Sequence, residues 1–173
     1  MFRKLLITIC FIFAYNNMVN ANENIYFINL NLLFNNSLFG KDVNKKIFDK
    51  GTLINKSIQD YEKIIKEEKI KLNSQKNVIN DDEYVNKNLL LEDNISKYAS
   101  DINNKKNDLE KFKFEANNKF LNELITILEI YSKENSIDMI FKKDSLLIVN
   151  NKFDLTNKIL DLLNKKVKNF NIE

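Results

Sequence analysis

The sequence predicts an α+β fold in which a long antiparallel coiled-coil helical hairpin projects from a small β-containing body. Three observations predict it. Apolar residues recur with a period of about 3.5 along two long stretches. Segments rich in β-branched and aromatic residues occur only near the ends of the chain. The 173 residues include 2 Gly and no Pro, so few residues interrupt the helices between those segments.

The N-terminal residues 1–21 have the composition of a cleaved signal peptide. Arg3 and Lys4 precede an apolar run, residues 5–14, that is too short to cross a bilayer. Small residues predict cleavage after Ala21, and an uncleaved anchor is the alternative. Removing the segment takes away the only Cys and leaves 25 basic against 24 acidic residues, a formal charge of +1. We therefore expect an exported chain that is held by packing or oligomerisation rather than by disulfides.

The next feature, residues 42–115, is predicted to be the hairpin arm. The first seam contains Ile47, Gly51, Ile54, Ile58, Tyr61, Ile65, Glu68, Leu72, Gln75 and Ile79. The second seam contains Leu91, Ile95, Tyr98, Ile102, Lys105, Leu109, Phe112 and Ala116. Spacings that alternate between three and four are typical of a coiled coil. Between the seams, Asp81 and Asp82 predict a turn with its tip near residues 80–83 and a helix cap at Asp82 or nearby.

The two seams also predict a register. When the chain is folded so that paired positions sum to about 163, Leu72 meets Leu91 and Ile54 meets Leu109. Gly51 then faces Phe112, and we expect its missing side chain to leave room for the ring. The seam becomes more polar toward the tip, at Glu68 and Gln75. Polar seam residues cost stability, so a mobile distal arm is predicted.

Residues 22–41 and 116–173 are predicted to form the body. After Ala116 the apolar stripe shifts phase by a stutter. The stutter falls at the base of the arm, where the second helix extends beyond its partner. Residues 24–30 predict one strand, and residues 138–141 and 146–149 predict a strand hairpin around residues 142–145. A final amphipathic helix follows, with Asp154 or Thr156 as its cap. Three strands leave open edges, so we expect several copies to share one sheet.

This order of elements resembles the Skp/OmpH-type periplasmic chaperone family. Ile137 and Asp138 match the family's start of the strand pair, and the Asp154-Leu155-Thr156 motif matches its opening of the last helix. The resemblance implies a homotrimer whose nine strands form a small barrel-like body, so that trimerisation completes the β body. Three hairpins would then enclose a cavity that holds unfolded outer-membrane proteins in the periplasm without ATP.

Two sets of residues are candidates for these roles. Apolar residues off the seams are predicted to contact unfolded clients: Ile64, Ile70, Val78, Val85 and Leu90. Body residues are predicted to mediate trimerisation: Tyr26, Ile28, Met139, Phe141, Leu147 and Val149. The alternative for the first set is that they support the hairpin or simply lie exposed.

Lysines crowd the outgoing helix of the arm: Lys63, Lys66, Lys69, Lys71 and Lys76. One interpretation is a weak contact with a membrane surface through anionic headgroups. Interleaved glutamates favour an ordinary solvated face instead. The nearly neutral mature chain and the acidic tip also depart from the clearly basic members of the family.

The composition argues against other function classes. The mature chain has no His and no Cys, which removes the commonest general base, the thiol nucleophile and most zinc ligands. No enzyme activity, metal or cofactor is therefore predicted, and a secreted hydrolase has little support. Nucleic-acid binding is not expected, because no basic stripe with interleaved aromatics occurs. The alternative function is a structural or tethering coiled coil of the cell envelope that binds no clients.

Overall fold

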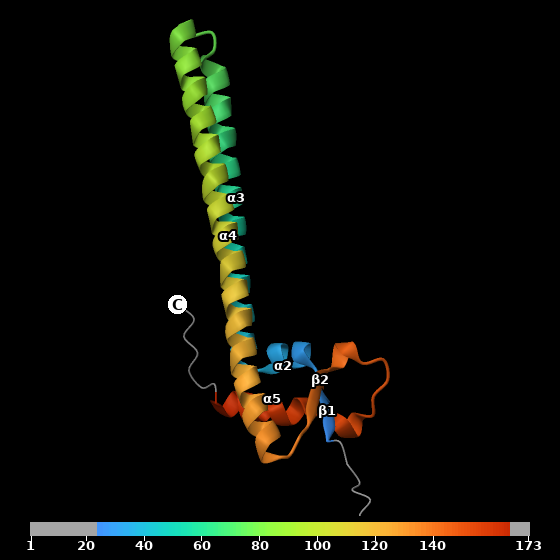
Figure 1. Cartoon of the computed structure of the whole chain (residues 1–173). Helices are drawn as coiled ribbons and strands as arrows, with labels where there is room; N and C mark the ends of the chain where they lie inside the picture. The colour runs from blue at the N-terminus through green and yellow to red at the C-terminus, as the bar shows by residue number, and fades with distance from the viewer. Residues whose placement is uncertain (1–23, 167–173) are drawn as a thin grey trace, which may run out of the picture.

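The computed structural model describes residues 24–166, so the predicted signal peptide lies outside the described residues. Two long helices form an antiparallel rod, and the other elements gather at its base (Figure 1). Helix α3 spans Leu38–Gln75 and helix α4 spans Asp81–Glu134. Within residues 24–166, no helix has the length and apolar content needed to cross a membrane.

The turn at the end of the arm occupies residues 76–80, slightly before the predicted tip. Asn80, rather than Asp82, caps α4, because its side-chain oxygen accepts a hydrogen bond of 2.8 Å from the backbone N–H of Glu83. Asp81, Asp82 and Glu83 form the first turn of α4. Carboxylates at this end of a helix interact favourably with its dipole.

At the base of the arm, Ser37 joins helix α2 (Leu30–Asn36) to α3. Its hydroxyl donates to the carbonyl oxygen of Phe34 at 2.9 Å and accepts from the N–H of Gly40 at 3.0 Å. The two helices approach so closely here that a Cβ on Gly40 would overlap the Phe34 carbonyl oxygen. Because Ser37 caps α3, the helix begins at Leu38 rather than near residue 42.

The body is built around strand β1 (Ile25–Ile28), which pairs in parallel with β2 (Met139–Lys142). Helix α5 (Thr156–Lys166) packs against α2 and α4. Asp154 and Thr156 both act at its start: Asp154 accepts from the Thr156 N–H at 2.8 Å, and the Thr156 hydroxyl accepts from the Asn29 N–H at 2.9 Å. The buried core comprises Ile28, Leu33, Phe39, Val43, Phe112, Ala116, Phe120, Leu124, Ile127, Ile159 and Leu163.

The predicted strand hairpin is wrong in its second half. A 3₁₀ turn, η1 (Lys143–Ser145), follows β2, and residues 146–149 form no strand. Leu146 and Val149 line an apolar pocket over the sheet, whereas Leu147 and Ile148 are fully exposed. The two partly buried residues, Leu146 and Val149, are three positions apart. This spacing is typical of a turn, because a strand would place every second residue on the same face. A second short 3₁₀ helix, η2 (Asn151–Phe153), follows. After it, the backbone N–H of Leu155 donates a hydrogen bond of 3.0 Å to the carbonyl oxygen of Phe27.

The register of the arm agrees with the prediction to within one residue. Across the seam, Lys105 donates a hydrogen bond to Ser57 and Lys87 donates one to Gln75. The ammonium group of Lys50 lies over the Phe112 ring. The numbers in each pair sum to 162. The explanation offered for Gly51 is wrong, because a Cβ there would meet no atom within 4 Å.

The two glycines therefore predict opposite responses to the same substitution. Gly51→Ala should stabilise the protein by about 0.5–1 kcal/mol, because it removes only the entropic cost of Gly inside a helix. Gly40→Ala should destabilise it by about 1–3 kcal/mol, because the methyl group collides with the Phe34 carbonyl oxygen. Urea unfolding followed by circular dichroism measures both, and a stabilised Gly40→Ala variant would contradict the packing at Ser37.

Candidate functional site

The arm displays apolar side chains to solvent along its length. The five residues predicted to contact clients are all exposed, with exposed fractions from 37% for Ile64 to 80% for Val78. Ile64 and Ile70 lie on α3, Val85 and Leu90 on α4, and Val78 in the turn. All five therefore lie in the half of the arm nearest the turn, on both helices and in the turn itself.

Four more exposed apolar residues on the arm were absent from the predicted set: Phe48, Leu53, Leu89 and Phe114. Each lies outside the 3.5-residue seams, so the rule that selected Ile64 and Leu90 would also have selected them. Of the three consecutive leucines at residues 89–91, only Leu91 is buried, as its seam position predicts.

Burial within the seam does not decrease toward the tip. Ile54 and Phe112 near the base and Leu72 and Leu91 near the tip are each 7% exposed. At mid-arm the rings of Tyr61 and Tyr98 stack with centroids 4.3 Å apart. The predicted mobility of the distal arm therefore finds no support in burial and stays a prediction.

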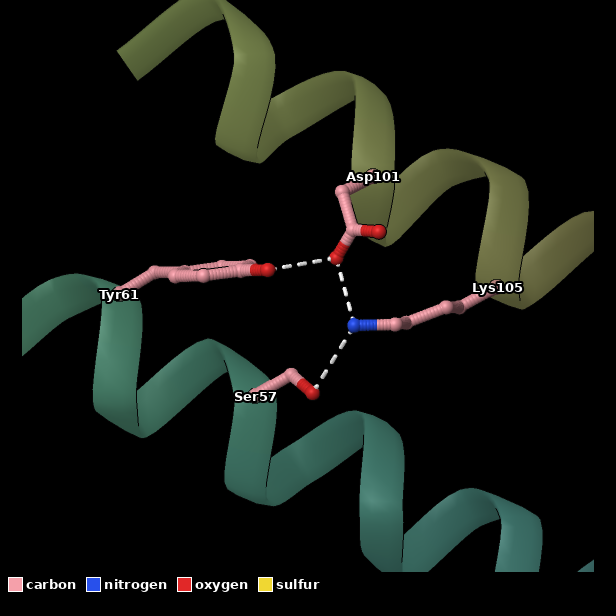
Figure 2. Close-up of polar contacts among 4 residues, drawn as sticks. All are labelled: Ser57, Tyr61, Asp101 and Lys105. Atoms are coloured by element: carbon pink, nitrogen blue, oxygen red, sulfur yellow. Dashed lines mark hydrogen bonds and ion pairs between the residues drawn. The ribbon is translucent and has the colours of Figure 1, made fainter. Parts of the chain in front are cut away.

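A polar cluster accompanies the tyrosine stack (Figure 2). The Tyr61 hydroxyl donates to Asp101 Oδ2 at 2.8 Å. Lys105 Nζ donates to the same oxygen at 2.6 Å and to Ser57 Oγ at 3.2 Å. The cluster thus ties α3 to α4 through one carboxylate and one ammonium. A polar layer of this kind specifies the register of paired helices at some cost in stability.

These bonds shift the ionisation of all three groups. The pKa of Asp101 is lowered, chiefly because its carboxylate accepts hydrogen bonds from Lys105 and then from Tyr61. The pKa of Tyr61 is raised, mainly because its hydroxyl donates to Asp101. The pKa of Lys105 is raised by its hydrogen bond to Asp101. All three shifts favour the protonation states present at neutral pH.

The predicted trimerisation residues occupy different environments in the body. Ile28 belongs to the chain's own core and has almost no exposed surface. Tyr26, Phe141 and Val149 line the apolar pocket over the sheet, which has a volume of about 370 Å³. Met139 is 47% exposed, and Leu147 is entirely so. All of the predicted residues except Ile28 therefore line this pocket or are exposed beside the sheet, next to the exposed Ile148.

Charged residues on the arm pair along each helix. Lys63 lies 3.9 Å from Glu67, Lys87 lies 2.9 Å from Glu83, and Lys97 lies 2.6 Å from Asp93, each at a spacing of four. Asp81 and Asp82 are exposed at the turn. Among residues 24–166, no three His, Cys, Asp or Glu side chains are grouped to hold a metal ion.

Comparison with known proteins gives two matches of interest. A family model described as outer membrane protein (OmpH-like) matches residues 24–163. The structure is similar to the crystal structure of a candidate outer membrane chaperone (OmpH-like) from Caulobacter crescentus, with a TM-score of 0.80 and 15% sequence identity. The match covers 88% of this chain and 90% of that one. No curated protein matches the sequence.

The polar cluster predicts a pH dependence of stability. Because the folded pKa of Asp101 lies below its unfolded value, its stabilising contribution is present above the unfolded pKa and lost as pH falls through the folded one. In urea unfolding, wild type should exceed Asp101→Asn in stability near neutral pH. The difference should begin to shrink near the unfolded pKa of about 4 and be lost only as pH falls through the lowered folded pKa of Asp101. Asp108→Asn removes an exposed carboxylate from the same helix as a control. A difference between wild type and Asp101→Asn that does not change with pH would contradict the assigned bonds.

Proposed function

The chain belongs to the OmpH-like family of outer membrane proteins, and on that premise we propose that it is an ATP-independent holdase chaperone of the periplasm. It binds unfolded outer-membrane proteins in a cavity between helical arms and prevents their aggregation. One observation carries this proposal: the arm exposes a series of apolar side chains although its seam residues are already buried between α3 and α4. Those side chains are available to a client because the fold of the arm does not need them.

The mechanism requires no catalytic residue. An unfolded outer-membrane protein offers many short apolar segments, and each makes a weak contact with one exposed side chain of the arm. Several such contacts within one cavity raise the effective concentration of client segments, so avidity replaces single-site affinity. Release then needs no ATP, because each contact breaks independently when the client finds a stronger partner.

A homotrimer supplies the several arms that a cavity requires. The exposed pair Leu147 and Ile148 and the apolar pocket over β1 support this assembly, since large apolar patches on soluble proteins mark interaction sites. Sheet edges that a single chain leaves open support it further. The periplasmic location follows from the family and from the predicted signal peptide. Weak contact of the arm lysines with a membrane surface stays a prediction.

The second candidate is a structural spacer of the cell envelope. The long rod formed by α3 and α4 favours it, because such a rod can hold two layers apart without binding anything. The two functions differ in whether the arm binds unfolded chains.

Suppression of aggregation tests the proposal. A denatured outer-membrane protein diluted into buffer should stay soluble when one trimer per client is present. Replacing Ile64, Ile70, Val78, Val85 and Leu90 together by Asn should reduce this suppression several-fold, because it removes apolar contact area. The matched control replaces exposed polar arm residues by Asn at Glu62, Lys66, Lys69, Glu92 and Lys106. Absence of suppression by wild type would favour the spacer.

Mass measurement tests the assembly. Light scattering of the mature protein should give the mass of three copies. Leu147→Asp combined with Ile148→Asp should shift the mass toward one copy, because it would bury two charges at the proposed contact. Leu89→Asp places a charge on an exposed leucine of the arm and should leave the mass unchanged. A wild-type monomer in dilute solution would contradict the trimer.

A further inference from the structure

Two grooves open between α3 and α4 along the arm, and they repeat one another. The tip groove lies around Leu72 and Leu91 and has a volume of about 290 Å³. The base groove lies around Ile54 and Leu109 and has a volume of about 200 Å³. Ile54 and Leu72 are 18 positions apart, as are Leu91 and Leu109. Eighteen residues make about five helical turns, so both grooves face the same side of the arm.

The polar groups of the grooves repeat at the same interval. In the base groove, Lys105 bonds Asp101, four residues earlier, and Ser57 across the seam. In the tip groove, Lys87 pairs with Glu83, also four residues earlier, at 2.9 Å, and bonds Gln75 across the seam at 3.0 Å. The cluster in Figure 2 is thus one of two equivalent lysine clamps.

Each clamp fixes an ammonium group at the rim of a groove that contains both leucines and polar side chains. An ammonium group has three donors, and the bonds to described residues use two of them. Each groove also has two lysines against one carboxylate among its lining residues: Lys71, Lys87 and Glu68 at the tip, and Lys50, Lys105 and Asp108 at the base. Glu83 and Asp101, which pair with Lys87 and Lys105, balance the remaining charge at each groove. The remaining donor of each clamp therefore suits a neutral acceptor, such as a backbone carbonyl of an occupant.

An exposed leucine completes each groove. Leu53 on α3 lines the base groove, and Leu90 on α4 lines the tip groove. Both volumes lie below the range of roughly 300–1,000 Å³ that is typical of small-molecule sites. The grooves therefore suit single apolar side chains of a polypeptide rather than a cofactor or metabolite.

The distance between the grooves sets the spacing of those side chains. Eighteen helical residues span about 27 Å, which an extended chain covers in about eight residues. Because side chains alternate along a strand, residues i and i+8 lie on the same side. A transmembrane β-strand has about 9–11 residues with apolar residues at alternate positions, so it meets this spacing without special sequence.

We propose that the two grooves form a two-point site for an extended polypeptide segment with apolar side chains eight residues apart. This proposal rests on the holdase function and specifies which client segments one arm binds. Leu53 and Leu90 contact the two apolar side chains, and Lys87 and Lys105 donate to the chain beside them.

Peptide binding to the full-length mature protein tests the spacing. The probe is a fluorescein-labelled peptide with two leucines eight residues apart among Asp, Ser and Thr. Its comparison peptide has the same composition with the leucines four residues apart. The first should bind at least about tenfold more tightly by fluorescence anisotropy, since it alone spans both grooves. Equal affinities would overturn the two-point site.

Substitutions locate the site. Leu53→Asn and Leu90→Asn should each abolish the preference for the eight-residue spacing, whereas Leu89→Asn and Phe114→Asn, which change exposed apolar residues outside the grooves, should preserve it. Circular dichroism verifies that each variant is folded. Loss of the preference in the two control variants would overturn the assignment. Wild type that suppresses aggregation without any spacing preference would overturn the two-point site and leave the holdase function intact. Wild type with the preference but no suppression would support the site and overturn the holdase function.

Discussion

The fold depends on one buried stripe that runs along helix α4. Leu91 and Phe112 of this stripe close the seam with α3, and Phe120, Leu124 and Ile127 continue it into the core of the body. Phe120 meets Phe34 of α2 with ring centroids 5.0 Å apart and Phe39 of α3 at 6.1 Å. Helix α4 therefore packs against α3 along the arm and against α2 and the rest of the body at its base.

Closure of the seam leaves the rest of the arm surface unconstrained. A helix with apolar residues on one stripe needs a single partner, and α3 supplies that partner for the arm. Exposed residues such as Phe48 and Phe114 then contribute nothing to the fold of the hairpin. The polar layer at Tyr61, Asp101 and Lys105 favours one register through hydrogen bonds. Register and exposed surface are thus determined by different residues.

The helices were predictable from sequence because their determinants are local. The 3.5-residue period identified the buried Ile54, Leu72 and Leu91, and Asp154 and Thr156 were identified at the start of α5. The failures involve contacts that no local pattern encodes. Residues 146–149 have the composition of a strand, yet a strand also needs a neighbouring edge, and η1 directs the chain over the sheet face instead. Gly51 and Gly40 look alike in sequence, but only the distance between α2 and α3 distinguishes them. The lysine clamps escaped prediction because each joins residues from both helices.

The exposed apolar residues differ in how they are arranged, and the arrangement indicates the kind of partner. Leu147 and Ile148 are adjacent, fully exposed, and near an apolar pocket of the body. A contiguous exposed apolar patch is typical of an interaction site. The exposed apolar residues of the arm are instead mostly separated in the sequence, apart from the adjacent Leu89 and Leu90, so each is expected to make only a weak contact. A permanent contact between copies suits the first arrangement, and reversible binding of unfolded chains suits the second. Under the proposed function, one molecule would assemble through its body while its arms exchange clients, because the two kinds of contact would use separate residues and need not compete.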